Sequence, residues 1–213
     1  LDAAEDTRAL NNLYTRGTKY TVFLAFPISL FAIINASPIM HFWMGKSGYE
    51  KSALAIQILI IGYSFVLVNS IGRLMARGMG VPQFEMVSAI IILVLNILLS
   101  VALIILLGFI GALIGSSVSA VIGSLYFMNR FHKHIKRTIT SFLREVYLKP
   151  MIACFFAFFS SLFISLLLNT LDFSPSGRIG FSVYLCLKGS VFLGAYLLCI
   201  FIVKYFDEYD INV

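Results

Sequence analysis

Charged side chains are scarce in this sequence. Asp, Glu, Lys and Arg together make up 12% of the 213 residues, whereas hydrophobic residues make up 60%. A soluble domain usually has about a quarter of its residues charged and about half apolar. A soluble fold of this length could not bury so much apolar surface. The composition therefore excludes an ordinary soluble protein and predicts an all-α integral membrane protein.

Histidine and cysteine are also rare, which restricts catalytic chemistry. The three histidines are expected in loops on two different membrane faces, where they cannot share a metal ion or join a catalytic triad: His41, His132 and His134. The three cysteines fall in apolar runs without a C-x-x-C pair, so we interpret them as packing residues rather than redox or metal ligands: Cys154, Cys186 and Cys199. We therefore predict no enzyme, no metal and no cofactor.

Six apolar runs are long enough to cross a bilayer. At roughly 1.5 Å per helical residue, about 20 residues span its hydrocarbon core. The spans are expected at residues 20–40, 52–71, 86–107, 110–129, 150–168 and 181–203.

These runs divide the chain into four parts. Residues 1–19 are predicted to be a cytoplasmic interfacial segment, or a connector to a preceding helix, because the chain opens on Leu1 like a fragment. Residues 20–129 hold four transmembrane helices, and residues 130–149 form a basic cytoplasmic loop. Residues 150–213 hold two more transmembrane helices and a cytoplasmic tail.

Lysine and arginine are unevenly divided between the two sets of loops. Twelve lie in the N-terminal segment, the loops 72–83 and 130–149, and the C-terminal tail, against three on the opposite face: Lys46, Lys51 and Arg178. Because these residues accumulate on the cytoplasmic side, both termini are predicted to be cytoplasmic. The net charge of +6 thus needs no nucleic acid to explain it, although the 130–149 patch could contact anionic lipid head groups.

Few polar side chains fall within or beside the spans, and we take them as candidates for a substrate path. Lys188, well inside a span, could bind a phosphate group, pair with a carboxylate, or snorkel to the head groups. Arg73 and Arg77 could bind a phosphate, although the positive-inside rule also explains them. Four amides could line a polar path or simply join helices by hydrogen bonds: Asn35, Gln57, Asn69 and Asn96.

Proline and glycine mark expected points of bending and close packing. Pro27 lies in the middle of the first span, where it should kink the helix. Gly108 and Phe109 leave room for only a tight helical hairpin between the third and fourth spans. The fourth span carries small residues four apart, which favour close packing of another helix, or alternatively a sliding surface: Gly111, Gly115, Ser119 and Gly123.

Two stretches resemble the polysaccharide and O-antigen flippases. Residues 13–48, LYTRGTKYTVFLAFPISLFAIINASPIMHFWMGKSG, resemble the family helix with a Lys-Tyr entry, a mid-helix Pro and an external Trp-x-Gly turn. Residues 96–123, with Leu-Asn-Ile, Gly-Phe-Ile-Gly-Ala and the small-residue stripe, resemble paired helices of that family. These paired helices also recur in the wider multidrug, oligosaccharidyl-lipid and polysaccharide exporter superfamily. The resemblance covers the first two thirds of the chain.

Carried over to this chain, the resemblance assigns a family position to five residues. It puts Pro27 at the kink, Trp43 and Gly45 at the external turn, and Gly108 with Gly111 at the hairpin. It implies a MATE-like fold of two lobes around a cavity, of which this chain would be a C-terminal fragment. The charged cavity residues of such flippases have no clear counterpart here.

The resemblance also implies a function, namely flipping a lipid-linked oligosaccharide across the bacterial cytoplasmic (inner) membrane by alternating access. Such a lipid is a precursor in polysaccharide biosynthesis, for example of O-antigen and lipopolysaccharide. The implied partners are the bilayer, the lipid-linked oligosaccharide and the polysaccharide polymerase machinery.

Three other functions are open on the sequence. A cation-coupled multidrug exporter of the same superfamily would favour an acidic residue inside a span, but every Asp and Glu is expected in a loop or at a span end. A membrane-embedded acyl- or glycosyltransferase would need a convergent His or Asp. A non-catalytic membrane subunit is the third alternative.

The loop charges generate a topology prediction. In a variant without the native cysteines, Ser47→Cys should react with a membrane-impermeant maleimide only from outside the cell, and Thr138→Cys only from the cytoplasm. Labelling of intact cells and of inverted vesicles measures both. The reverse pattern would show that the termini are external.

Overall fold

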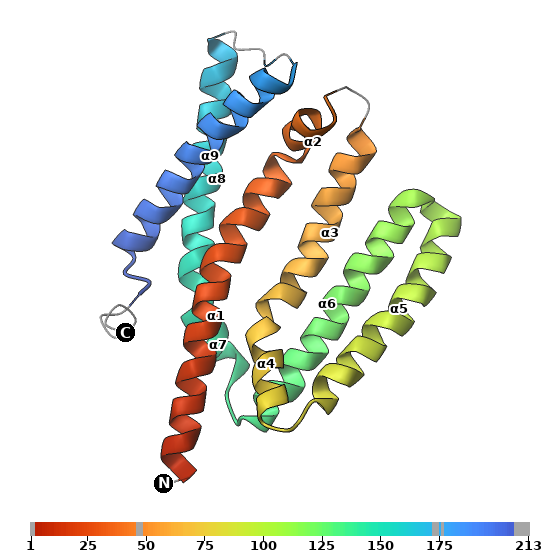
Figure 1. The fold of residues 1–213 in the computed structure, drawn as a ribbon, viewed down its shortest axis with the longest axis vertical. Helices are drawn as coiled ribbons and strands as arrows, with labels where there is room; N and C mark the ends of the chain where they lie inside the picture. Colours follow the sequence, from red (N-terminus) through yellow and green to blue (C-terminus); the bar gives the residue numbers. More distant parts are fainter. Residues whose placement is uncertain (1–2, 46–48, 172–174, 176, 207–213) are drawn as a thin grey trace. The chain divides into compact units, whose positions relative to one another are not determined.

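The structure, a computed structural model, describes residues 3–45, 49–171, 175 and 177–206, and within these ranges it is helical with no strand (Figure 1). The helices are α1 (Ala3–Ile34), α2 (Ala36–Met44), α3 (Glu50–Val68), α4 (Ser70–Gly78), α5 (Gln83–Leu107), α6 (Phe109–His134), α7 (Ile139–Val146), α8 (Leu148–Thr170) and α9 (Gly177–Ile202). Six stretches are long and apolar enough to cross a membrane, with α3 and α4 forming one of them. The predicted all-α membrane fold is confirmed. Lys46, Ser174, Ser176 and the tail beyond Phe206 lie outside the described residues.

The first span is interrupted at Asn35, where the sequence analysis expected no break. Helix α1 runs through Pro27 without interruption, and the chain leaves the helix at Asn35 instead. Pro38 explains the position of this break, since it has no N–H to donate to the carbonyl of Ile34 and its ring crowds that carbonyl. Pro27 lies inside the continuous helix α1, and the kink expected there stays a prediction.

A second interruption lies at Asn69, between α3 and α4. The Asn69 side chain donates to the carbonyl of Phe65, 2.9 Å away, and so competes with the regular backbone bonds of the helix. The chain then resumes as α4, which carries both Arg73 and Arg77. The expected polar turn over residues 72–83 is thus wrong, since the turn spans only residues 79–82.

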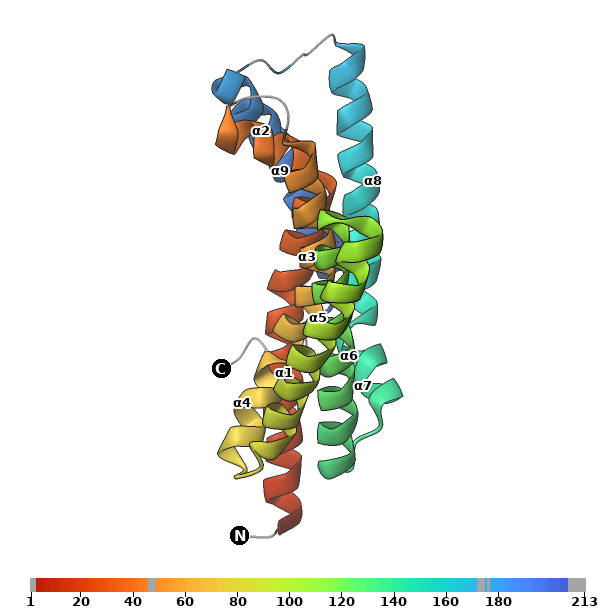
Figure 2. The ribbon, with the colours of Figure 1, turned by 90° about the vertical axis from the view of Figure 1, so that its right-hand side faces the viewer.

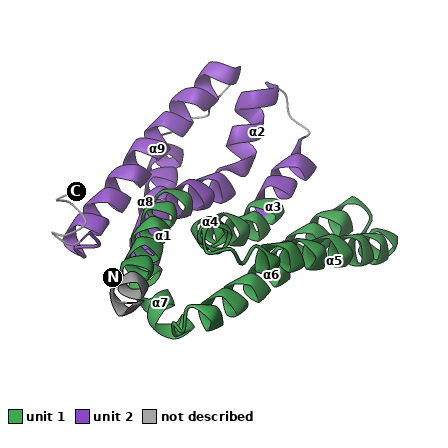
Figure 3. Ribbon diagram, turned by 60° about the horizontal axis from the view of Figure 1, so that its bottom comes forward, with its two compact units in different colours: residues 1–25, 58–148 green, residues 26–57, 149–213 purple. Residues whose placement is uncertain are grey.

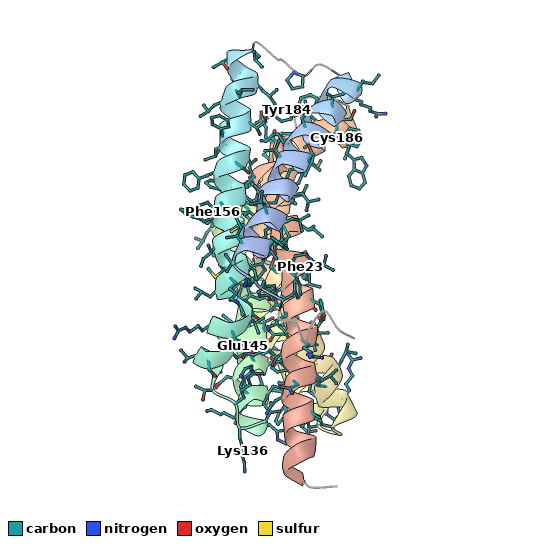
Figure 4. The ribbon with its side chains drawn as sticks, turned by 90° about the vertical axis from the view of Figure 1, so that its left-hand side faces the viewer. Phe23, Lys136, Glu145, Phe156, Tyr184 and Cys186 are labelled. Carbon is teal, nitrogen blue, oxygen red and sulfur yellow. The ribbon has the colours of Figure 1, made fainter. Side chains whose placement is uncertain are left out.

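Two further boundaries differ from the sequence prediction. Helix α1 has no break between Lys19 and Tyr20, so the polar segment and the first span are one helix. Helix α6 continues past residue 129 to His134, and the basic loop contains helix α7. Lys136 lies in the turn before α7 and Glu145 lies on α7 (Figure 4).

The chain divides into two compact units, coloured separately in Figure 3. Unit 1 contains residues 1–25 and 58–148, and therefore the first part of α1, most of α3, and α4 to α7. Unit 2 contains residues 26–57 and 149–213, and therefore the rest of α1, α2, the start of α3, α8 and α9. The division crosses α1 between Ala25 and Phe26, two residues before Pro27.

Within unit 1, α5 and α6 form a hairpin whose helices lie side by side (Figures 1 and 2). Gly108 alone separates them, with a φ of +60° that side chains other than glycine rarely adopt. The small residues of α6 face α5 at very short range. A Cβ added to Gly111 would lie 2.0 Å from the carbonyl oxygen of Leu103, and one added to Gly115 would lie 2.7 Å from the backbone nitrogen of Ser100.

The other small residues continue this contact toward the far end of the hairpin. A Cβ on Gly123 would lie 2.3 Å from a side-chain carbon of Ile92, and Ser88 donates a 2.8 Å hydrogen bond to the Gly123 carbonyl. Ser119 is fully buried on α6. The partner of the small-residue stripe is therefore the preceding helix, α5.

The hairpin generates a prediction on two matched glycine substitutions. Gly115→Ala should destabilise the protein by about 1–3 kcal/mol, because its Cβ overlaps the backbone of Ser100. Gly194→Ala should be neutral or stabilise by roughly 0.5–1 kcal/mol, because nothing lies within 4 Å of its added Cβ and alanine favours the helix. Thermal unfolding in detergent measures both. Equal shifts in the two variants would contradict the packing of α6 on α5.

Candidate substrate-path residues

Two of the four amides, Asn69 and Asn96, join helices of unit 1. Asn69 Nδ2 lies 3.4 Å from the carbonyl of Ser124 on α6, in addition to its bond within its own helix. Asn96 Oδ1 accepts hydrogen bonds from Ser100 at 2.8 Å and from Ser116 on α6 at 3.3 Å. Both side chains thus stabilise the packing of α6, as expected if these amides join helices by hydrogen bonds rather than line a polar path.

The two amides of unit 2 differ from each other. Gln57 Nε2 donates to the carbonyl of Ile33 at 2.9 Å and so connects α3 with the end of α1. Asn35 Nδ2 donates to the carbonyl of Phe31 at 3.0 Å, which fixes the orientation of the amide. Its Oδ1 is buried and has no hydrogen-bond partner within the described part of the chain. Asn35 alone among the four amides therefore retains an unused buried acceptor.

Arg73 and Arg77 also have different surroundings. Arg77 is exposed and forms a bidentate pair with Glu85 at the start of α5, with Nε 2.6 Å from Oε2. Arg73 is half-buried, and its guanidinium lies over the Phe127 ring at 5.5 Å from the centroid. Its Nε and Nη2 atoms are buried and, among the described residues, have no acceptor. Arg73 is therefore the arginine with donors available for a ligand.

Lys188 is buried in the middle of α9, with 4% of its surface exposed. It lies eleven residues after the start of α9, or roughly 16 Å along the helix. Its Nζ is 3.4 Å from the Tyr184 hydroxyl and 5.1 Å from the centre of the Tyr184 ring. The side chain thus points toward the N-terminal end of α9, as snorkelling would require. Snorkelling does not, however, explain why the side chain is buried.

The sequence analysis missed a cluster of aromatic side chains in unit 1. Tyr14 on α1 stacks on Phe142 of α7 at 4.7 Å between ring centres, and its edge meets Phe131 of α6 at 5.2 Å. Its hydroxyl is 3.1 Å from His132 Nε2. His132 is buried on α6 rather than in a loop, so the loop placement predicted for it is wrong.

Arg137, in the turn before α7, forms hydrogen bonds and a ring contact that stabilise this aromatic cluster. Its Nη1 donates to the Thr15 hydroxyl and lies 3.4 Å from the carbonyl of Asn11, both on α1. Its Nη2 donates to Glu145 at 2.7 Å, and its guanidinium lies 4.9 Å from the centre of the Phe142 ring. The four-residue spacing of Phe127, Phe131 and Ile135 was the available signal, because it continues the apolar face of α6 past residue 129.

The described residues offer little for catalysis or metal binding. No group of three or more His, Cys, Asp or Glu side chains in that part of the chain could hold a metal ion. The three cysteines are free thiols, of which Cys154 is buried in α8 and Cys186 is exposed on α9. Beside the aromatic cluster, burial raises the pKa of the Tyr147 hydroxyl above its usual range, so this group stays neutral.

Comparison with known proteins gives one family and one relative. Residues 3–102 match the model of the MatE family, whose members are transporters and not enzymes, in agreement with the prediction of a non-enzyme. The chain is 25% identical over 200 residues to an uncharacterized membrane protein of Methanocaldococcus jannaschii. The match covers 91% of this chain but 35% of that relative, so the chain spans about a third of the relative's length. No solved structure matches the chain.

Proposed function

We propose that this chain is part of a transporter that flips a lipid-linked oligosaccharide across the cytoplasmic membrane by alternating access. The MatE match over residues 3–102 and the six apolar spans support a membrane transporter. A bacterial inner membrane, cytoplasmic termini and contact with a polysaccharide polymerase are further parts of this proposal, and they rest on the sequence resemblance and the loop charges.

The observation that carries the choice of substrate is the sign of the buried charges. Lys188 in α9 and the half-buried Arg73 in α4 are cationic, and both lie within candidate spans. In the described part of the six candidate spans, the carboxylates are those of Glu50 and Glu85, and both lie at the start of a helix. A cationic side chain in a membrane favours an anionic cargo, such as the phosphate groups that link a sugar to its lipid.

A cation-coupled drug exporter is the second candidate, because the MatE match does not distinguish the two cargoes. It would require a buried carboxylate to hold the coupling ion or the cationic drug. Neither Glu50 nor Glu85 is buried, and Glu85 is already paired with Arg77. This pairing favours the oligosaccharide flippase.

Alternating access needs positions at which a helix can bend, and three lie in the first two spans. Pro27 removes one backbone hydrogen bond inside α1, next to the point where the chain passes from unit 1 to unit 2. Asn35 and Asn69 interrupt their spans outright. Such positions can absorb the dihedral changes of a hinge.

The proposed hinge at Pro27 generates a prediction on transport. Pro27→Ala should restore the missing backbone bond, stiffen α1, and lower transport several-fold while the amount of protein in the membrane stays near normal. The measurement is complementation of a flippase-deficient strain, with surface polysaccharide and membrane protein level read together.

Pro82→Ala is the matched control, because Pro82 caps the start of α5 and breaks no helical ladder. It should leave both readouts unchanged. Normal polysaccharide with Pro27→Ala would show that Pro27 only shapes α1. A wild-type protein that restores no polysaccharide but confers drug resistance would favour the exporter instead.

A further inference from the structure

Lys188 is incompletely bonded for a buried charge. An ammonium group has three donors, and among the described residues the one hydrogen bond found for it is to the Tyr184 hydroxyl at 3.4 Å, beyond the usual length of a strong bond. Burial of a charge is costly unless the charge is paired or fully hydrogen-bonded. An ion pair within unit 2 would explain the buried lysine. Among the described residues of this unit, however, the one carboxylate is Glu50, at the start of α3.

Asn35 has the complementary deficiency. Its side chain is 0% exposed, and no donor among the described residues reaches its Oδ1. Because Nδ2 donates to the Phe31 carbonyl, exchanging the amide oxygen and nitrogen by a flip would lose this bond and so would not resolve the deficiency. A buried polar atom without a partner is destabilising, so such an atom calls for a ligand or another specific explanation.

The helix register brings these two groups to the same level. In unit 2, Phe31 of α1 meets Phe192 of α9 at 5.4 Å between ring centres, and His41 of α2 stacks on Phe181 at 4.9 Å. Between these two contacts, Asn35 lies four residues after Phe31 and Lys188 lies four residues before Phe192. Because residues four apart share a helix face, Asn35 and Lys188 both face the contact between α2 and α9.

The same contact carries a second cation near the N-terminus of α9. Arg178 lies against Gly45 at the C-terminus of α2, where an added Cβ would be 2.6 Å from its Nε. Tyr184, labelled in Figure 4, lies between Arg178 and Lys188 on α9 and offers both a ring and a hydroxyl. The contact between α2 and α9 thus carries two cations, an aromatic ring and, within the described part of the chain, one acceptor without a donor.

We propose that Lys188 and Asn35 form a binding site for a glycosyl phosphate, with Lys188 donating to a phosphate oxygen and Asn35 Oδ1 accepting from a hydroxyl of the adjoining sugar. The ligand must offer an acceptor and a donor side by side, and a phosphate joined to a sugar has both. A phosphate diester without a hydroxyl would satisfy Lys188 but not Asn35. This inference rests on the proposed function and assigns residues to its substrate.

Binding by Lys188 variants tests the site. The protein is reconstituted in phosphatidylcholine nanodiscs, and native mass spectrometry measures binding of undecaprenyl-diphosphate N-acetylglucosamine. Lys188→Met should weaken binding about tenfold or more, and Lys188→Arg should restore part of it, as expected for a charged hydrogen bond. The control is Lys51→Met, which removes the same charge from an exposed position of unit 2 and should have no effect. Equal affinities of Lys188→Met and Lys51→Met would overturn the site.

Two other probes test the chemistry of the ligand. Dioleoyl phosphatidic acid and inorganic diphosphate offer phosphate oxygens without a sugar, so both should bind more weakly than the glycosyl probe. Asn35→Leu should weaken the glycosyl probe by roughly threefold to tenfold and leave the other two probes unchanged. A wild-type protein that binds either sugar-free probe as tightly as the glycosyl probe would overturn the role given to Asn35.

Folding and transport are measured on the same variants. Lys188→Met should keep or raise the apparent melting temperature, since an apolar side chain of similar size removes the cost of burying a charge. A marked loss of stability would indicate that Lys188 is a structural residue and would overturn the inference. If the wild-type protein flips a fluorescent glycosyl diphosphate lipid in liposomes and Lys188→Met does so equally fast, this inference fails and the proposed function stands. If the wild-type protein binds that lipid through Lys188 but does not flip it, the proposed function fails and the site stands.

Discussion

Hydrocarbon forms no hydrogen bonds, and this constraint determines most of what the structure contains. Each polar group inside a span must find its partner within the protein, so the six candidate spans are built from helices. The same requirement accounts for Gln57, Asn69 and Asn96, whose amides bond to carbonyls or hydroxyls of another helix. Asn35 and Lys188 stand out because they only partly meet it.

Small side chains take over the role that the hydrophobic effect has in water. Lipid tails are as apolar as leucine, so helices in a bilayer gain by packing closely rather than by hiding apolar surface. Glycines on α6 let the backbone of α5 approach, and the same helix accepts α3, where a Cβ on Gly62 would lie 2.5 Å from the Cα of Ser117. Between α1 and α7 the contacts are of another kind, because Tyr14 stacks on Phe142 and Arg137, in the turn before α7, donates to Thr15.

The sequence predicted the elements better than the contacts. Length and hydropathy suffice to find a span, so the six spans and the tight hairpin at Gly108 and Phe109 could be predicted, although Phe109 already belongs to α6. Helix interruptions depend on which carbonyl loses its partner, and the break at Asn35 lies where Pro38 leaves the Ile34 carbonyl without a donor. The His132 contact joins residues 118 positions apart, and no local pattern reports such a distance. For Lys188 the sequence left an ion pair, a ligand and snorkelling open, because burial depends on the neighbouring helices.

The single glycine between α5 and α6 has a consequence for how the protein enters the membrane. Helix α5 is the most apolar of the six spans, whereas α6 carries serines and glycines and is less apolar than α5. Because Gly108 gives no slack, α6 cannot stay behind in the aqueous channel of the insertion machinery once α5 has moved into lipid. The two helices therefore partition as one hairpin, and the strongly apolar helix carries its weaker neighbour into the bilayer.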